Sequence, residues 1–203
     1  MRKPVTVAVL LTALSFAPCM AAPAPQGAVE QIKSFYASLI ETMKRGKELG
    51  IEGRFKQLAP AVEKAFDIPA MTRLSVGPVW NMLSESDRDQ IIVAFRRMTI
   101  ANFAKNFSSF GGEQFVTAPA PKPRNDDQIV ETKLIGSSKT ETPFNYRMHV
   151  AGEEWKVLDM YLNGYVSQLA VRRSDFSATV TSAGAAGLVK KINDLVDKQM
   201  KEG

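Results

Sequence analysis

Residues 143–162 contain two alternating segments joined by a tight turn, and they restrict the chain to folds with an antiparallel sheet. The turn is predicted at Ala151-Gly152, and residues 154–162 return the chain. In the first segment, one face is predicted to hold Phe144, Tyr146, Met148 and Val150. In the second, strict alternation places Trp155, Val157, Asp159 and Tyr161 on one face and Leu158, Met160 and Leu162 on the other. Both of these faces are largely apolar, which is typical of a central strand covered by helices.

Helical periodicity precedes the strand patterns. Residues 28–49 carry one apolar stripe that ends at Gly50 and Gly53, and residues 54–66 predict a second helix. Asp67 is suited to cap a short helical turn through Met71. Ser84 or Ser86 then caps a long helix over residues 85–106.

Strand patterns occupy the middle of the chain and helical patterns return at its end. Residues 115–118 and 128–135 predict strands, with an extended, exposed Pro-rich loop over 118–125 between them. Ser174 is predicted to cap a helix over 175–182, and a final amphipathic helix follows. The order of helices, strands and helices predicts an α+β fold, in which helices pack on a twisted antiparallel sheet.

The first residues have the pattern of a cleavable export signal. Arg2 and Lys3 precede an apolar run over 5–17, and small residues follow. We expect a signal peptide over 1–21, a flexible lead-in over 22–27 and one domain over 28–203. The alternative is a lipid-modified Cys19, but Pro18 stands where a small residue normally precedes such a cysteine.

Charge and composition exclude some classes of partner. Removal of residues 1–21 leaves 24 basic and 21 acidic residues, a net charge of +3. This excess is too small to indicate nucleic-acid binding. Two basic pairs, Arg96-Arg97 and Arg172-Arg173, are either solvated helix faces or docking points for an acidic partner.

We find no pattern that predicts catalysis, a metal or a cofactor. His149 is the only histidine, the chain lacks a Gly-x-Ser-x-Gly nucleophile motif, and no cysteine remains after cleavage. Asp67 and Asp159 stand among apolar residues. The favoured interpretation is a helix cap for Asp67 and a buried, hydrogen-bonded carboxylate for Asp159, paired with Arg147 or Arg172. The alternative is acid/base chemistry in a hydrolase.

Several motifs in this order resemble the MlaC/toluene-tolerance family. They are Phe66-Asp67-Ile-Pro-Ala-Met71, Val76-Gly77-Pro-Val-Trp80, Gln90-x4-Phe95, Tyr146 with Trp155-Lys-Val-x-Asp159-x4-Gly164, and Arg173-Ser-Asp-Phe176. The segment from Gly164 to Phe176 is similar to a hopanoid-associated, HpnM-like branch of that family. Gln168 stands where the wider family has an apolar residue, which favours a polycyclic lipid.

The resemblance implies a periplasmic carrier that is not an enzyme, with an MlaC-like (NTF2-like) fold around an apolar pocket. Its implied cargo is a hopanoid or a phospholipid. Its implied partners are an inner-membrane ABC transporter with an MCE-domain subunit and an outer-membrane complex. From their elements and faces, we expect the pocket to be lined by Trp80, Phe95, Met98, Phe103, Tyr146, Met148, Val157 and Met160. The alternative function is a scaffold subunit of a membrane transporter that binds no lipid itself.

Overall fold

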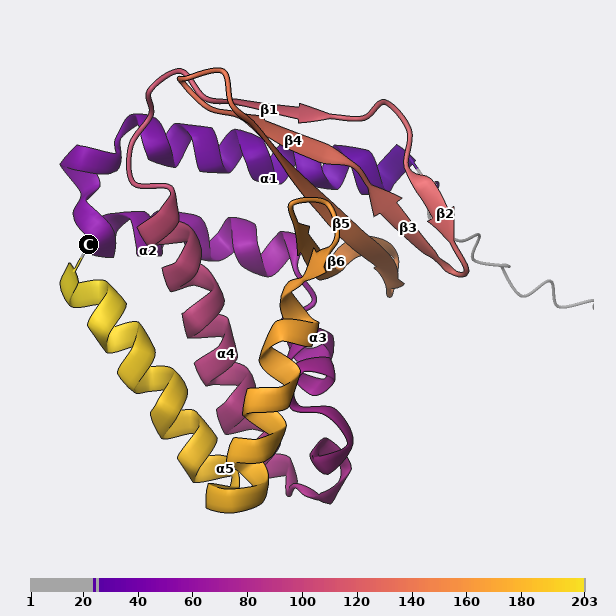
Figure 1. Ribbon diagram of the computed structural model, residues 1–203, viewed down its shortest axis with the longest axis vertical. Coiled ribbons are helices and arrows are strands. Elements are labelled where there is room, and N and C mark those ends of the chain that lie inside the picture. The colour runs from indigo at the N-terminus through magenta and orange to yellow at the C-terminus, as the bar shows by residue number, and fades with distance from the viewer. Residues whose placement is uncertain (1–23, 25, 203) are drawn as a thin grey trace, which may run out of the picture.

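The chain is arranged as a helical half, a sheet and a returning helix (Figure 1). The computed structural model describes residue 24 and residues 26–202. The helical half consists of α1 (Gln26–Lys44), α2 (Gly46–Ala65), α3 (Ile68–Val76), the 3-10 helix η1 (Gly77–Met82) and α4 (Glu85–Asn106). The predicted signal peptide and half of the lead-in lie outside the described residues, and the end of the lead-in belongs to α1.

The sheet is antiparallel, as predicted, but it is built around β5 rather than around the strand over 154–162. Its strands are β1 (Gln114–Thr117), β2 (Lys122–Arg124), β3 (Asp127–Val130), β4 (Thr132–Ile135), β5 (Glu141–Ala151), β6 (Glu154–Leu162) and β7 (Val166–Ser167). One edge of β5 pairs first with β4 and then with β3, and its other edge pairs with β6. The helix α5 (Gln168–Glu202) follows the sheet. The α+β prediction is therefore confirmed.

The single strand predicted over 128–135 is two strands, because the chain bends at Glu131. At the bend, the Thr132 backbone N–H donates to Asn145 Oδ1 at 3.3 Å, and the Thr132 hydroxyl donates to the Phe144 carbonyl. Where the backbone hydrogen bonds between the strands are interrupted, hydrogen bonds from side chains to backbone groups replace them. This lets β3 and β4 share the same edge of β5.

A β-bulge in β6 overturns the strict alternation predicted for its faces. Arg147 pairs with Asp159 and Met148 with Val157, so Leu158 has no opposite residue. Because cross-strand partners share a face, Val157 and Met160 lie on the same face as Tyr146 and Met148. The prediction that placed Val157 and Met160 on opposite faces was wrong. The hairpin turn is also shifted by one residue, to Gly152-Glu153.

Local capping signals predicted two helix starts correctly. The Ser84 hydroxyl accepts from the Asp87 backbone N–H at 3.1 Å and begins α4, and Asp67 accepts from the Ala70 N–H at 3.0 Å and begins α3. The helix break predicted at Gly50 is present, because Gly50 has a non-helical conformation within α2. An additional division, between α1 and α2 at Arg45, was not predicted.

The start of α5 was predicted seven residues too late. The helix begins at Gln168 rather than at Asp175, with the Ser167 hydroxyl accepting from the Ala170 N–H at 3.0 Å. It breaks once, at Gly184, and its second half turns back beside α4 (Figure 1). Among residues 26–202, no helix combines the length and apolar character needed to cross a membrane.

Candidate binding cavity

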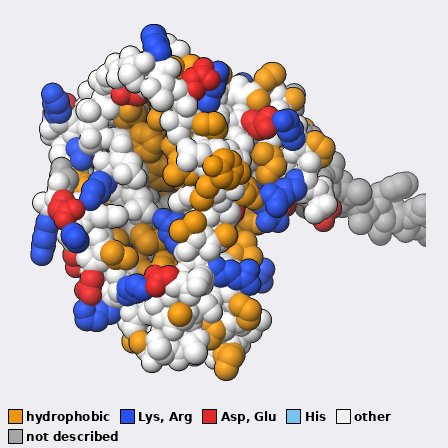
Figure 2. Space-filling model, in the orientation of Figure 1, with side chains coloured by type: hydrophobic (Ala, Val, Ile, Leu, Met, Phe, Trp, Pro, Cys, Tyr) orange, Lys and Arg blue, Asp and Glu red, His pale blue; other side chains and the backbone are white. Residues whose placement is uncertain are grey.

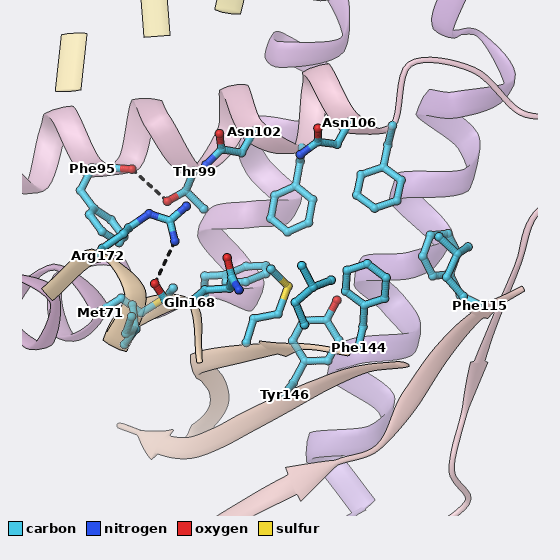
Figure 3. Close-up of a pocket in the computed structure, with 17 residues that line it drawn as sticks. Met71, Phe95, Thr99, Asn102, Asn106, Phe115, Phe144, Tyr146, Gln168 and Arg172 are labelled. Carbon is cyan, nitrogen blue, oxygen red and sulfur yellow. Dashed lines mark hydrogen bonds between the residues drawn. The ribbon is translucent and has the colours of Figure 1, made fainter. Parts of the chain in front are cut away.

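A cavity of about 400 Å³ lies between the sheet, α4 and the first turns of α5. Figure 2 shows hydrophobic side chains inside a hollow on this face, and Figure 3 shows the lining from within. Most lining residues are aromatic or aliphatic: Phe66, Met71, Phe95, Phe103, Phe107, Phe115, Leu134, Phe144, Tyr146, Met160, Leu162 and Leu169. The polar remainder consists of Thr99, Asn102, Asn106, Gln168 and Arg172.

One face of α4 forms a wall of the cavity. Phe95, Thr99, Asn102, Phe103 and Asn106 recur at intervals of about one helical turn, so their side chains point the same way. The Thr99 hydroxyl donates to the Phe95 carbonyl at 2.9 Å, and Asn102 Oδ1 accepts from the Gln199 side chain at 3.0 Å. The Thr99 hydroxyl and the Asn102 side-chain oxygen thus have hydrogen-bond partners within the protein.

The opposite wall is the hairpin of β5 and β6. Phe144 and Tyr146 come from β5, and Met160 and Leu162 come from β6. Tyr146 pairs with Met160 across the two strands, and Phe144 pairs with Leu162. The cavity therefore lies at one end of the hairpin.

Tyr146 belongs to a buried group of hydroxyls behind this wall. Tyr36 Oη lies 3.1 Å from Tyr146 Oη and 2.5 Å from Thr132 Oγ1. Burial raises the pKa of Tyr36 to about 12, and burial also raises the pKa of Tyr146 well above 10. Both tyrosines are therefore neutral at ordinary pH, and this wall carries no negative charge.

Among the described residues that line the cavity, Arg172 is the one that carries a formal charge. It lies one helical turn after Gln168 and donates through Nη1 to the Gln168 carbonyl at 3.0 Å. Burial lowers the pKa of Arg172, and the negative charge of Asp159 partly opposes that shift. A guanidinium remains protonated in proteins, so the group is a partly desolvated cation beside an apolar space.

Asp159 is hydrogen-bonded at both oxygens and only 5% exposed. Oδ1 accepts from the Met160 N–H at 2.8 Å and the Leu169 N–H at 3.2 Å, while Oδ2 accepts from the Ser167 hydroxyl at 2.5 Å. The prediction of a buried, hydrogen-bonded carboxylate is confirmed. Of the two partners expected for Asp159, Arg147 instead bonds Asp127 at 2.5 Å, whereas Arg172 interacts with the Asp159 charge without forming an ion pair within 4 Å.

Asp67 and His149 meet away from the cavity. Asp67 Oδ2 lies 2.9 Å from His149 Nε2, while Oδ1 caps α3. The predicted capping role of Asp67 is confirmed. Neither Asp67 nor Asp159 lines the cavity. Among the described residues, no cluster of three histidine, cysteine or acidic side chains has the geometry of a metal site.

The eight residues predicted to line a pocket are divided by the structure. Phe95, Phe103, Tyr146 and Met160 line the cavity. Trp80, Met98, Met148 and Val157 are buried in the surrounding core and are not among the lining residues. Met148 and Val157 share the cavity-facing side of the hairpin, but they lie further along it, where Phe66 bridges to Val157.

The two arginine pairs also lie in different surroundings. Arg96 pairs with Glu63, and Arg97 pairs with Asp197 at 2.6 Å. Arg173 is exposed beside Gly77, whereas Arg172 lines the cavity. Gln168 and Arg172 were not predicted to line the cavity, because the last helix was expected to begin at Asp175 rather than at Gln168.

Comparison with known proteins identifies a family and solved structures with a similar fold. The family model described as "MlaC protein" matches residues 33–194, well over half of the chain. A solved structure of a phospholipid-binding protein from Ralstonia solanacearum, in complex with a phospholipid, superposes with a TM-score of 0.74. It is 17% identical, and the match covers 85% of this chain and 98% of the other. A search of curated proteins finds no match.

Proposed function

Since this chain belongs to the MlaC protein family, we propose that it is a periplasmic lipid-binding protein whose cargo lies in the apolar cavity. The observation that carries the proposal is the cavity itself, with its aromatic and aliphatic walls. Its size is within the range of about 300–1,000 Å³ that is usual for ligand pockets.

The physical task of such a protein is to shield hydrocarbon from water. Each buried methylene contributes about 0.8 kcal/mol, so a free lipid crosses an aqueous compartment poorly. An apolar cavity removes this barrier without a nucleophile or a metal. The part of the cavity that is lined by Phe144, Met160 and Leu162 is suited to hold hydrocarbon.

The cargo and the route are further parts of the proposal. The fold neighbour was solved with a phospholipid, which supports phospholipid as cargo. The similarity of residues 164–176 to the hopanoid-associated branch supports a hopanoid. We propose that the signal peptide directs the chain to the periplasm. There it moves lipid between an inner-membrane ABC transporter with an MCE-domain subunit and an outer-membrane complex. Exposed Arg173 is the most accessible residue of the two arginine pairs for docking.

Lipid extraction from protein purified from its native host tests the proposal. We expect mass spectrometry to find co-purified lipid in the wild-type protein. Met160→Trp places a bulky ring in the cavity and should lower the lipid content about tenfold or more. Met82→Trp is the matched control because Met82 is 84% exposed and outside the cavity. This control should retain the wild-type content.

The same experiment separates the carrier from the scaffold alternative. A folded wild-type protein that neither retains lipid nor takes it up from vesicles would refute the carrier proposal. A Met160→Trp variant that loses lipid while transport continues would favour the scaffold role.

A further inference from the structure

We propose that Arg172 recognises an anionic group of the cargo, so that the cavity selects lipids carrying a carboxylate or a phosphate over neutral lipids of the same apolar size. This inference rests on the proposed function and adds to it a chemical class of cargo. The recognised chemistry is an oxyanion joined to a hydrocarbon body.

The first argument is the charge balance of the cavity. Arg172 is a cation, and the described residues that line the cavity include no aspartate or glutamate. Tyr146, the other titratable lining residue, is kept neutral by burial, which raises its pKa. The site therefore presents one positive charge to whatever occupies it.

The second argument is that the nearest carboxylate is committed elsewhere. Asp159 accepts from the backbone N–H groups of Met160 and Leu169 and from the Ser167 hydroxyl. Among the described residues, Arg172 makes no ion pair with any carboxylate within 4 Å. Asp159 thus moderates the local potential but leaves the guanidinium available to a ligand.

The third argument is the direction and capacity of the guanidinium. It reaches from α5 toward the Thr99 and Phe95 side of the cavity, and its Nη1 is held by the Gln168 carbonyl (Figure 3). A guanidinium has five N–H donors in a planar fork, and one of them is used by the Gln168 carbonyl. The remaining fork matches the two oxygens of a carboxylate or phosphate.

Selectivity for anionic cargo follows from the loss of water around the Arg172 guanidinium when the cavity is filled. A bound hydrocarbon body displaces water from the cavity, so the guanidinium loses solvation when cargo enters. An anionic cargo replaces the lost water with charge-assisted hydrogen bonds. A neutral cargo offers no such hydrogen bonds, so the lost water is compensated only by the Gln168 carbonyl and the more distant charge of Asp159. Selection therefore arises from the penalty on neutral lipids as well as from attraction to anionic ones.

Binding of lipids that share one acyl chain tests the inference. The probes are palmitate, palmitoyl lysophosphatidic acid and monopalmitoylglycerol, each added to delipidated protein and measured by displacement of a fluorescent lipid. We expect the wild type to bind the two anionic probes about 10- to 100-fold more tightly than the neutral one. Comparison of palmitate with lysophosphatidic acid shows whether a carboxylate or a phosphate is preferred.

Variants assign the preference to Arg172. Arg172→Gln should weaken the anionic probes about 10- to 100-fold and change the neutral probe by less than about threefold. Arg172→Lys should retain part of the preference because it keeps the charge without the fork. Arg73→Gln is the charge-matched control, since Arg73 is exposed on α3 outside the cavity.

Three outcomes would overturn the inference. They are equal wild-type affinity for anionic and neutral probes, equal weakening of all probes by Arg172→Gln, or an equal effect of Arg73→Gln. The first needs no variant, so the test holds even if Arg172→Gln fails to fold. If the wild type binds none of the three probes and no other lipid, the proposed function fails as well.

Discussion

Behind the cavity wall, a single tyrosine can present an apolar ring to the cavity and at the same time hydrogen-bond through its buried hydroxyl. Tyr146 is 2% exposed and presents its ring to the cavity, while its hydroxyl lies 3.1 Å from that of Tyr36. Tyr36 in turn contacts Thr132, and its ring stacks on Phe115 with centroids 4.3 Å apart. These hydrogen bonds fix the orientation of one wall without placing a charge in it.

This arrangement predicts a loss of stability at high pH. The folded-state pKa of Tyr36 is about 12, above the value of 10 in an unfolded chain. The folded state therefore holds more protons between these pH values, and its stability is full below pH 10 and falls as pH rises toward 12. Each such group contributes up to about 1.4 kcal/mol per pH unit.

Urea unfolding across this range, compared between wild type and Tyr36→Phe, measures the effect. The variant should be less stable at neutral pH but should lose less stability as the pH rises. Parallel stability curves for the two proteins above pH 10 would contradict the assignment.

Residue-level predictions from the sequence succeeded where the signal was local. Asp67 and Ser84 were recognised as caps because a cap depends on residues within one turn. Arg172 was not recognised as a cavity residue. Its position depends on where α5 begins, and that start is set by Ser167 and by the contact of Leu169 N–H with Asp159, ten residues away.

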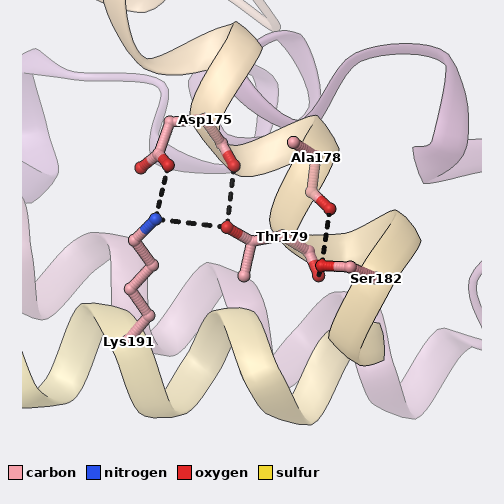
Figure 4. Close-up of polar contacts among 5 residues, drawn as sticks. All are labelled: Asp175, Ala178, Thr179, Ser182 and Lys191. Atoms are coloured by element: carbon pink, nitrogen blue, oxygen red, sulfur yellow. Dashed lines mark hydrogen bonds and ion pairs between the residues drawn. The ribbon is translucent and has the colours of Figure 1, made fainter.

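At the scale of elements, α5 is a helical hairpin rather than one rod. Its two halves are tied across the break by Lys191, which donates to the Asp175 carboxylate and, at 3.2 Å, to the Thr179 hydroxyl (Figure 4). The break is at Gly184, with φ of 68° and ψ of −175°, a conformation that is largely restricted to glycine. The first half carries the cavity residues, and the second half packs along α4.

Gly184→Ala is therefore expected to destabilise the protein by about 1–3 kcal/mol. An added Cβ would have no neighbour within 4 Å, so the cost comes from backbone strain and not from a clash. Ala183→Gly, at the preceding exposed position, is the control and should cost about 1 kcal/mol or less. Chemical denaturation gives both values. Wild-type stability in Gly184→Ala would show that the break does not need glycine.

The elements predicted best were those whose limits are marked by local residues. The bounds of α4 and β6 agree with the sequence pattern, because the Ser84 cap precedes α4 and a glycine turn precedes β6. The bulge at Leu158 and the bend at Glu131 were not predictable in this way. Both arise from pairing with β5, a contact between segments that local periodicity does not record.

At the scale of the whole molecule, the cavity makes stability depend on cargo. A space lined by Phe, Met and Leu side chains forgoes packing contacts that a filled core would supply. A ligand that binds only the folded state adds RT ln(1 + [L]/Kd) to the free energy of unfolding, or about 2.7 kcal/mol at a hundredfold excess over Kd. The loaded protein should therefore be markedly more stable than the empty one.

Thermal unfolding of delipidated protein, with and without the lipid recovered by extraction, measures this difference. The midpoint should rise with lipid concentration in the wild type and in Met82→Trp, and should rise little in Met160→Trp. An unchanged midpoint in the wild type at saturating lipid would mean that the lipid does not bind the folded state selectively.

The resemblance to a family implied both the fold class and an apolar pocket, whereas only half of the residues expected to line the pocket do so. Motifs such as Phe66-Asp67 and Trp155 to Gly164 identify a family by their order along the chain. A cavity is a mismatch of volumes between a sheet and several helices, and composition does not encode it. Half of the expected pocket residues consequently lie in solid core nearby.

The walls of the cavity are drawn from residue 66 at one extreme to residue 172 at the other. A growing polypeptide therefore cannot form the complete cavity until residue 172 has been synthesised and the first turns of α5 have packed. Binding of any ligand to the complete cavity consequently follows synthesis of most of the chain.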